Sequence, residues 1–118
     1  MLNYKKNKVM EKMGFREMNI QYKVEENGRE CRVIAVLSGN FLPKLRISVH
    51  EVDLSGLEQR LRTLGVWDII VFGRNPEFCD VVVSENDRSV SCIHCYIRRR
   101  GVRFEVVDCS LNGTQVII

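Results

Sequence analysis

The stretch "SVSCIHCYI", residues 89–97, decides how this chain is interpreted. Cys92, His94 and Cys95 lie within four residues of one another, which suggests a metal site, a cysteine nucleophile or simply the start of a strand. Side chains alternate along a strand, so Cys92 and His94 would share one face and Cys95 would point to the other. The sequence on either side has to distinguish these interpretations.

Short segments rich in Val and Ile surround this stretch, and turn residues separate them. Segments of strand length at close spacing, without helices between them, predict a β-sandwich. Gly101 marks a hairpin turn. The predicted strands of this region cover residues 67–73, 79–84, 91–99, 102–108 and 114–118.

Alternating apolar residues predict three further strands upstream, over residues 20–24, 31–37 and 45–49. Asn27-Gly28 tolerates a positive φ and therefore predicts a hairpin turn between the first two. We expect the 20–24 strand to pair with the 31–37 strand and to cover its free edge.

One short helix is predicted near residues 55–64. Ser55 is the expected N-cap, and Glu58 three residues later completes a capping box. Leu57, Leu61 and Leu64 would then form one apolar face. We expect this helix to cover one end of a sheet.

Composition predicts one soluble domain. The chain has 118 residues, 45% of them apolar and 28% charged, which is typical of a globular domain. Residues 1–17 are expected to form a basic tail or a frayed helix, and residues 18–118 the domain. Its longest apolar run is too short for a membrane span, and the charged N-terminus does not resemble a signal peptide. We therefore expect an intracellular protein.

The net charge and the number of cysteines are both typical of an intracellular protein that does not bind nucleic acid directly. A net charge of +3 without a basic stripe gives no reason to expect direct nucleic-acid binding. Five cysteines without a secretory signal predict reduced thiols rather than a disulfide framework.

Three polar motifs follow one another at strand–loop junctions, where β-sandwiches gather binding residues. They are Gly73-Arg74, the stretch from Ser91 to His94, and the loop 108–114 with the sequence "DCSLNGT". An arginine fork suits a phosphate group. A serine hydroxyl and an asparagine amide add donors and acceptors.

This ordered set of motifs resembles the forkhead-associated (FHA) domain, most sharply over residues 73–114. The resemblance implies an all-β, FHA-like (SMAD/FHA) sandwich that binds phosphothreonine peptides through loops at one end. It further implies a non-enzymatic protein–protein interaction module of signalling, with no cofactor and a nuclear rather than cytoplasmic location.

The resemblance also implies roles for individual residues. Arg74 matches the arginine that contacts the phosphate, Ser91 the serine beside it, and Asn112 the asparagine that holds the peptide backbone. The residues expected to shape the loops are Gly73, His94, Asp108, Gly113 and Thr114.

Two features depart from the family pattern. Cys92 stands where the family usually has arginine, and Arg88 in the same loop is the expected substitute. Leu111 offers no side-chain hydrogen bond beside Asn112. The alternative is therefore an interaction or dimerisation module with weakened or lost phosphate dependence.

A further departure is that the final strands of the family are missing, because the chain ends at Ile118. The 20–24 strand would replace them. Otherwise a second copy or a longer parent protein supplies the missing part, since an open sheet edge invites pairing. A homodimer through that edge is expected on this ground.

Zinc is the rival interpretation of the opening stretch. Cys92-x-x-Cys95 has suitable spacing, and Cys79, Cys109 and His94 could complete a site. No second C-x-x-C pair exists, however, and no group is evident that would orient His94 for catalysis. We expect neither a metal site nor catalysis, and assign His50 and Trp67 to packing.

Overall fold

The computed structural model describes residues 13–118. The tail predicted over residues 1–17 falls largely outside these residues. In chain order the described elements are α2 (Phe15–Glu26), β1 (Arg32–Ser38), β2 (Lys44–Ile47), β3 (His50–Asp53), the 3₁₀ helix η1 (Leu54–Leu57), α3 (Glu58–Arg62), β4 (Ile69–Gly73), β5 (Val81–Val82), β6 (Cys95–Arg100), β7 (Arg103–Asp108) and β8 (Gln115–Ile117).

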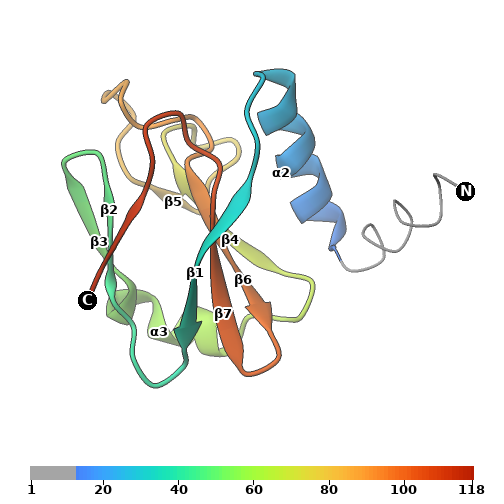
Figure 1. Ribbon diagram of the computed structural model, residues 1–118, viewed down its shortest axis with the longest axis vertical. Helices are drawn as coiled ribbons and strands as arrows, with labels where there is room; N and C mark the ends of the chain where they lie inside the picture. Colours follow the sequence, from blue (N-terminus) through green and yellow to red (C-terminus); the bar gives the residue numbers. More distant parts are fainter. Residues whose placement is uncertain (1–12) are drawn as a thin grey trace, which may run out of the picture.

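The strands form two sheets that pack face to face (Figure 1). One sheet has five strands in the order β1-β7-β6-β4-β5, and the other has three in the order β3-β2-β8. The described pairs are antiparallel except β4–β5, which is parallel. The predicted β-sandwich is thus confirmed, and all five strands predicted after residue 66 are present.

Strand β4 of the five-stranded sheet is buried on both faces. Ile70 and Phe72 of β4 point into the core shared with the small sheet. Ile69 and Val71 point the other way, into a second apolar cluster. Burial on both faces explains why this strand is an unbroken apolar run rather than an alternating one.

The prediction of a strand over residues 20–24 is wrong, because this segment belongs to helix α2. Ile20 and Val24 are buried while Tyr22 between them is 61% exposed. Residues four apart share one face of a helix. The predicted hairpin turn is instead the end of this helix, where Gly28 has a φ of 71° and donates its N–H to Glu25 O at 2.8 Å.

Helix α2 covers the outer face of the five-stranded sheet. Its buried Glu17 accepts hydrogen bonds from Tyr96 Oη at 2.5 Å and from Arg98 Nη1 at 2.6 Å. Arg98 also donates from Nε to Glu105 at 2.7 Å. The sequence predicted that residues 20–24 pair with the edge of β1. This prediction is wrong, because these residues lie in α2 on the face of the sheet.

The predicted helix near 55–64 is confirmed as η1 followed by α3. Leu61 and Leu64 are buried as expected. The predicted cap is wrong, because Asp53 rather than Ser55 caps the segment and accepts the N–H of Ser55 at 3.0 Å.

The strand predicted over residues 45–49 is shorter and is followed directly by another. β2 ends at Ile47, and β3 returns antiparallel to it. Ser48 makes the turn between them with a φ of 59°, a left-handed conformation that is uncommon outside glycine.

Cys31 and Cys109 form a disulfide, so the prediction of reduced thiols is wrong for this pair. Cys79, Cys92 and Cys95 are free thiols. Within residues 13–118, no helix has the length and apolarity needed to cross a bilayer.

Candidate functional site

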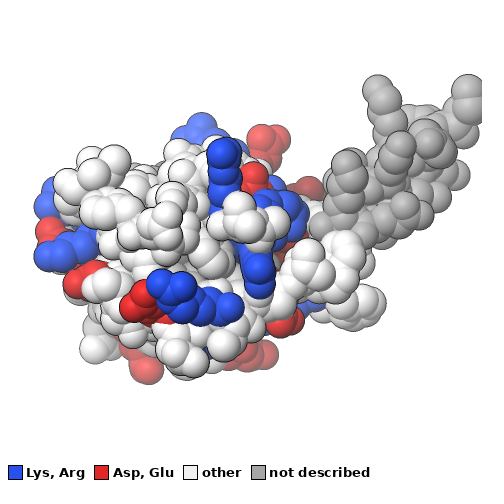
Figure 2. Space-filling view, turned by 90° about the horizontal axis from the view of Figure 1, so that it is seen from below, with Lys and Arg blue, Asp and Glu red and all other residues white. Residues whose placement is uncertain are grey.

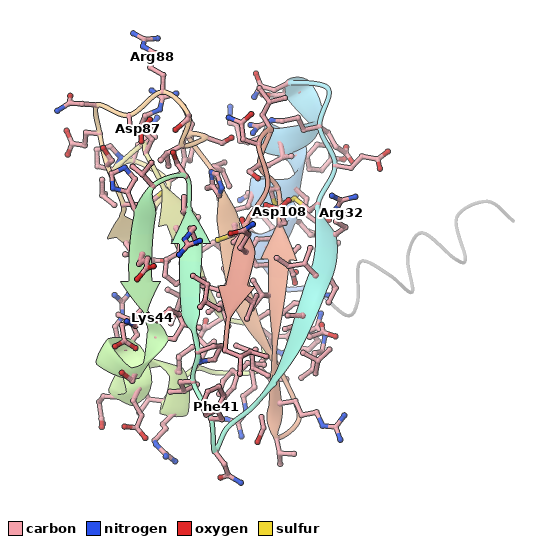
Figure 3. All side chains as sticks on the ribbon, turned by 60° about the vertical axis from the view of Figure 1, so that its left-hand side comes forward. Arg32, Phe41, Lys44, Asp87, Arg88 and Asp108 are labelled. Carbon is pink, nitrogen blue, oxygen red and sulfur yellow. A yellow bond between two sulfur atoms is a disulfide. The ribbon has the colours of Figure 1, made fainter. Side chains whose placement is uncertain are left out.

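The polar motifs meet at one end of the sandwich. Gly73 ends β4 and Arg74 follows it, the 83–94 loop precedes β6, and the 109–114 loop connects β7 to β8. β4 and β7 both run antiparallel to β6, so their last residues lie beside its first. Figure 3 shows these loops at the same end as Asp87 and Arg88.

Gly73 allows the end of β4 to touch the 91–94 segment. A Cβ atom at this position would lie 2.5 Å from Cys92 O and 2.9 Å from Cys79 Sγ. No side chain fits at such distances, so the chain needs glycine before Arg74 for steric reasons.

The Arg74 guanidinium is held against the loop before β6. Its Nε donates to Val90 O at 2.9 Å, and Nη2 donates to Cys92 Sγ at 3.2 Å. Its backbone N–H donates to Ser91 O at 3.0 Å. The two bonds of the guanidinium use Nε and Nη2. The N–H groups of Nη1 are therefore left to bind an anion.

Ser91 connects this loop to the 109–114 loop. Its Oγ accepts the N–H of Leu111 at 3.1 Å, and its own N–H donates to His94 Nδ1 at 3.0 Å. The hydroxyl hydrogen of Ser91 is not needed for either bond and can be donated to a ligand.

His94 is a buried brace between two loops. Since Nδ1 accepts the Ser91 N–H, the proton lies on Nε2, which donates to Gly113 O at 2.9 Å. Burial lowers the pKa of His94, and this favours the neutral ring that both bonds require.

Asp108 organises the loop that carries Asn112. Its Oδ1 accepts hydrogen bonds from Ser110 Oγ at 2.7 Å and Thr114 Oγ1 at 2.8 Å. Gly113, at a φ of 93°, donates its N–H to Ser110 Oγ at 2.7 Å. The loop is therefore closed by its own side chains.

Asn112 is exposed and reaches across to the other loop, where Nδ2 donates to Ser89 O at 3.1 Å. Hydrogen bonds thus connect the segments that carry Arg74, Ser91 and Asn112. Sequence reasoning assigned these three residues to one ligand, and the structure places them at one end of the sandwich.

Arg88 lies apart from them. Figure 3 shows its side chain extending away from the body of the domain. No hydrogen bond joins it to the three residues above within the described chain. In this orientation the Arg88 side chain does not lie beside Arg74, where the predicted substitute for the missing arginine would be needed.

Sequence reasoning missed a polar cluster beside the site. Asp87 accepts hydrogen bonds from Ser89 Oγ at 2.6 Å and from His50 Nε2 at 2.9 Å. It also accepts one from Ser48 Oγ at 3.3 Å. The Ser89 hydroxyl and N–H, followed by His50, lower the pKa of Asp87 to about 2. The Asp-x-Ser pattern of residues 87–89 was the available signal, since Asp bonds locally to backbone two residues on.

The zinc interpretation fails on the placement of its ligands. Both ring nitrogens of His94 are engaged, and Cys109 is bonded to Cys31. Cys95 is buried in the core between the sheets, where burial raises its pKa. Residues 13–118 hold no group of three or more His, Cys, Asp or Glu side chains placed to bind a metal ion.

Comparison with known families shows that the model of the FHA domain matches residues 70–117. This segment contains all three motifs and runs from β4 to β8. Comparison with curated proteins and with solved structures gave no match.

Proposed function

Residues 70–117 belong to the FHA domain family, and from this premise we propose that the protein recognises phosphothreonine in a partner protein. FHA domains are in general phosphopeptide-binding interaction modules rather than enzymes. The finer assignment comprises phosphothreonine as the ligand, signalling as the role, and Arg74, Ser91 and Asn112 as the binding residues.

The observation that carries this proposal is the set of hydrogen bonds connecting the segments of those three residues. A phosphothreonine has a charge of about −1.5 to −2 and three acceptor oxygens near neutral pH. Arg74 can offer Nη1, and Ser91 its hydroxyl. Hydrogen bonds to charged groups contribute about 1.5–3 kcal/mol each. Two or three of them suit micromolar binding once the ordering of the peptide is subtracted.

One observation favours a second function. Arg74 directs Nη2 to the sulfur of Cys92, at the position where an arginine would be expected in the family. A cysteine in this position does not supply the cation that an arginine would direct at a phosphate. The alternative is an interaction or dimerisation module that binds its partner without depending on phosphate.

Isothermal titration calorimetry with a phosphothreonine peptide library and its unphosphorylated twins separates the two. We expect the phosphorylated forms to bind at least about tenfold more tightly, a difference of about 1.4 kcal/mol. Arg74→Gln should remove this difference. Arg103→Gln is the matched control, because this exposed arginine begins β7 at the opposite end of the sandwich.

Equal affinity for phosphorylated and unphosphorylated peptides would exclude phosphate recognition and support the alternative. Unchanged affinity in Arg74→Gln would show that the assigned pocket is wrong. The proposal also includes an intracellular, nuclear location, supported by the resemblance alone. Fluorescence microscopy of the tagged chain in cells tests that part.

A further inference from the structure

A pocket separate from Arg74, Ser91 and Asn112, called here the second pocket, lies beside the start of the 109–114 loop. It has a volume of about 270 Å³. One wall is the segment between α2 and β1, and the other is the start of the loop itself. The lining residues are Arg29, Glu30, Arg32, Asp108, Ser110 and Leu111.

A disulfide fixes the two walls of this pocket to each other. Cys31 stands between Glu30 and Arg32, and it is bonded to Cys109, which precedes Ser110. Figure 3 shows the yellow disulfide bond close to Arg32 and Asp108. The left-handed Gly28 ends α2 and directs the chain into this segment. The pocket is therefore built by covalent and backbone constraints rather than by side chains alone.

Leu111 connects the candidate phosphopeptide site to the second pocket. Its backbone N–H donates to Ser91 Oγ, and the residue, which is 77% exposed, also lines the second pocket. An extended peptide advances about 3.3–3.6 Å per residue. Because Leu111 contacts Ser91 and also lines the second pocket, we expect a peptide residue near the phosphothreonine to lie beside this pocket.

The two arginines of this pocket are available for an anion. Neither Arg29 nor Arg32 forms an ion pair with a carboxylate of the described residues. Asp108 is only 4% exposed, and its Oδ1 already accepts the hydrogen bonds of its own loop. Glu30 is the exposed carboxylate that opposes an anion here.

Resting on the phosphopeptide function proposed above, we infer that this pocket binds a second anionic group of the same peptide. The group is the carboxylate of Asp or Glu, or the phosphate of a second phosphorylated residue, near the phosphothreonine. Arg29 and Arg32 bind it, and the apolar part of the neighbouring peptide side chain packs on Leu111. The ligand class is thus an acidic or doubly phosphorylated phosphopeptide.

The test uses phosphothreonine peptides with alanine at the surrounding positions and with aspartate substituted at each position in turn. We expect aspartate at one position to tighten binding about fivefold, the upper range for a surface ion pair. Arg29→Gln and Arg32→Gln should reduce this gain but keep the affinity for the alanine peptide. A second phosphothreonine at the same position then distinguishes a carboxylate from a phosphate ligand.

Glu30→Gln provides a test of opposite sign, because it removes the opposing charge and should increase the gain. Arg103→Gln, far from the loops, should leave it unchanged. Figure 2 shows the end of the molecule opposite the loops, where basic and acidic side chains are interspersed.

The outcomes separate this inference from the function on which it rests. If aspartate and alanine peptides bind equally at every position while phosphate dependence remains, the second pocket is wrong and the function stands. A gain that survives both Arg29→Gln and Arg32→Gln would also overturn the inference. If no peptide binds better when phosphorylated, the proposed function fails and the second pocket with it.

Discussion

Three Asp-x-Ser sequences close local turns in this domain. Asp53, Asp87 and Asp108 each accept the N–H and the hydroxyl of the serine two residues later. The first caps η1, and the other two shape loops of the candidate site. An aspartate with a serine in this position offers the backbone a turn in place of a helix or strand. One local pattern therefore organises both of these loops.

At the residue scale, His94 gives a prediction about pH. Burial lowers its pKa below the ordinary value of 6.5. Below about pH 6.5 His94 binds a proton in the unfolded chain but remains neutral in the folded protein until the pH reaches its lowered pKa. The free energy of unfolding should therefore fall from that pH down to the lowered pKa, by at most about 1.4 kcal/mol per pH unit.

Imidazole ¹⁵N NMR measures this directly. We expect the midpoint of His94 to lie below pH 6.5, with the proton of the neutral ring on Nε2. A midpoint at or above 6.5 would contradict the brace between Ser91 and Gly113. His50, which is exposed by about a third at its side chain and bonded to Asp87, is the internal comparison.

At the scale of elements, one buried carboxylate joins α2 to the sheet. Glu17 is 2% exposed and meets Tyr96 and Arg98, which lie 79 and 81 residues away in the sequence. Removing one partner of a buried ion pair leaves the other uncompensated, which typically costs 3–5 kcal/mol. Arg98 keeps its bond to Glu105, so the cost should lie at the lower end of this range.

We therefore expect Glu17→Gln to lower the free energy of unfolding by about 3 kcal/mol in urea denaturation. Glu25→Gln is the control, because this residue is exposed on the same helix and should change stability by less than about 0.5 kcal/mol. Equal stability of the two variants would mean that α2 contributes little to holding the domain together.

At the scale of the whole molecule, one edge strand of the sandwich is β1. Within residues 13–118, β1 pairs with β7 on one side and with no strand on its other side. Val33 and Val36 on this strand are 44% and 54% exposed. Free strand edges with apolar side chains favour pairing with another chain, and this supports the homodimer expected from the sequence.

Light scattering after size-exclusion chromatography tests the edge. We expect the mass to rise towards that of a dimer as the concentration increases, and Val36→Lys to keep the chain monomeric. Val102→Lys is the control, because Val102 is 83% exposed in the β6–β7 turn. A wild-type chain that stays monomeric at high concentration would exclude this edge as a dimer interface.

The limits of sequence-based prediction are clearest at residues 20–24. Ile20 and Val24 fit alternation in a strand, but residues four apart also share a helix face. The contacts of Glu17 with Tyr96 and Arg98, together with burial on the outer sheet face, stabilise the helix here. Those contacts are long-range, so the local pattern could not distinguish the two.

The amino-acid sequence alone determined the strands after residue 66, the order of the three motifs and the need for glycine at position 113. These features depend on side-chain alternation, steric space and local turn chemistry, which neighbouring residues carry. Tertiary structure alone decided that α2 is a helix on the sheet and that Cys31 pairs with Cys109 across 78 residues. It also built the second pocket beside Leu111, because folding brings together segments whose contacts the sequence does not encode locally.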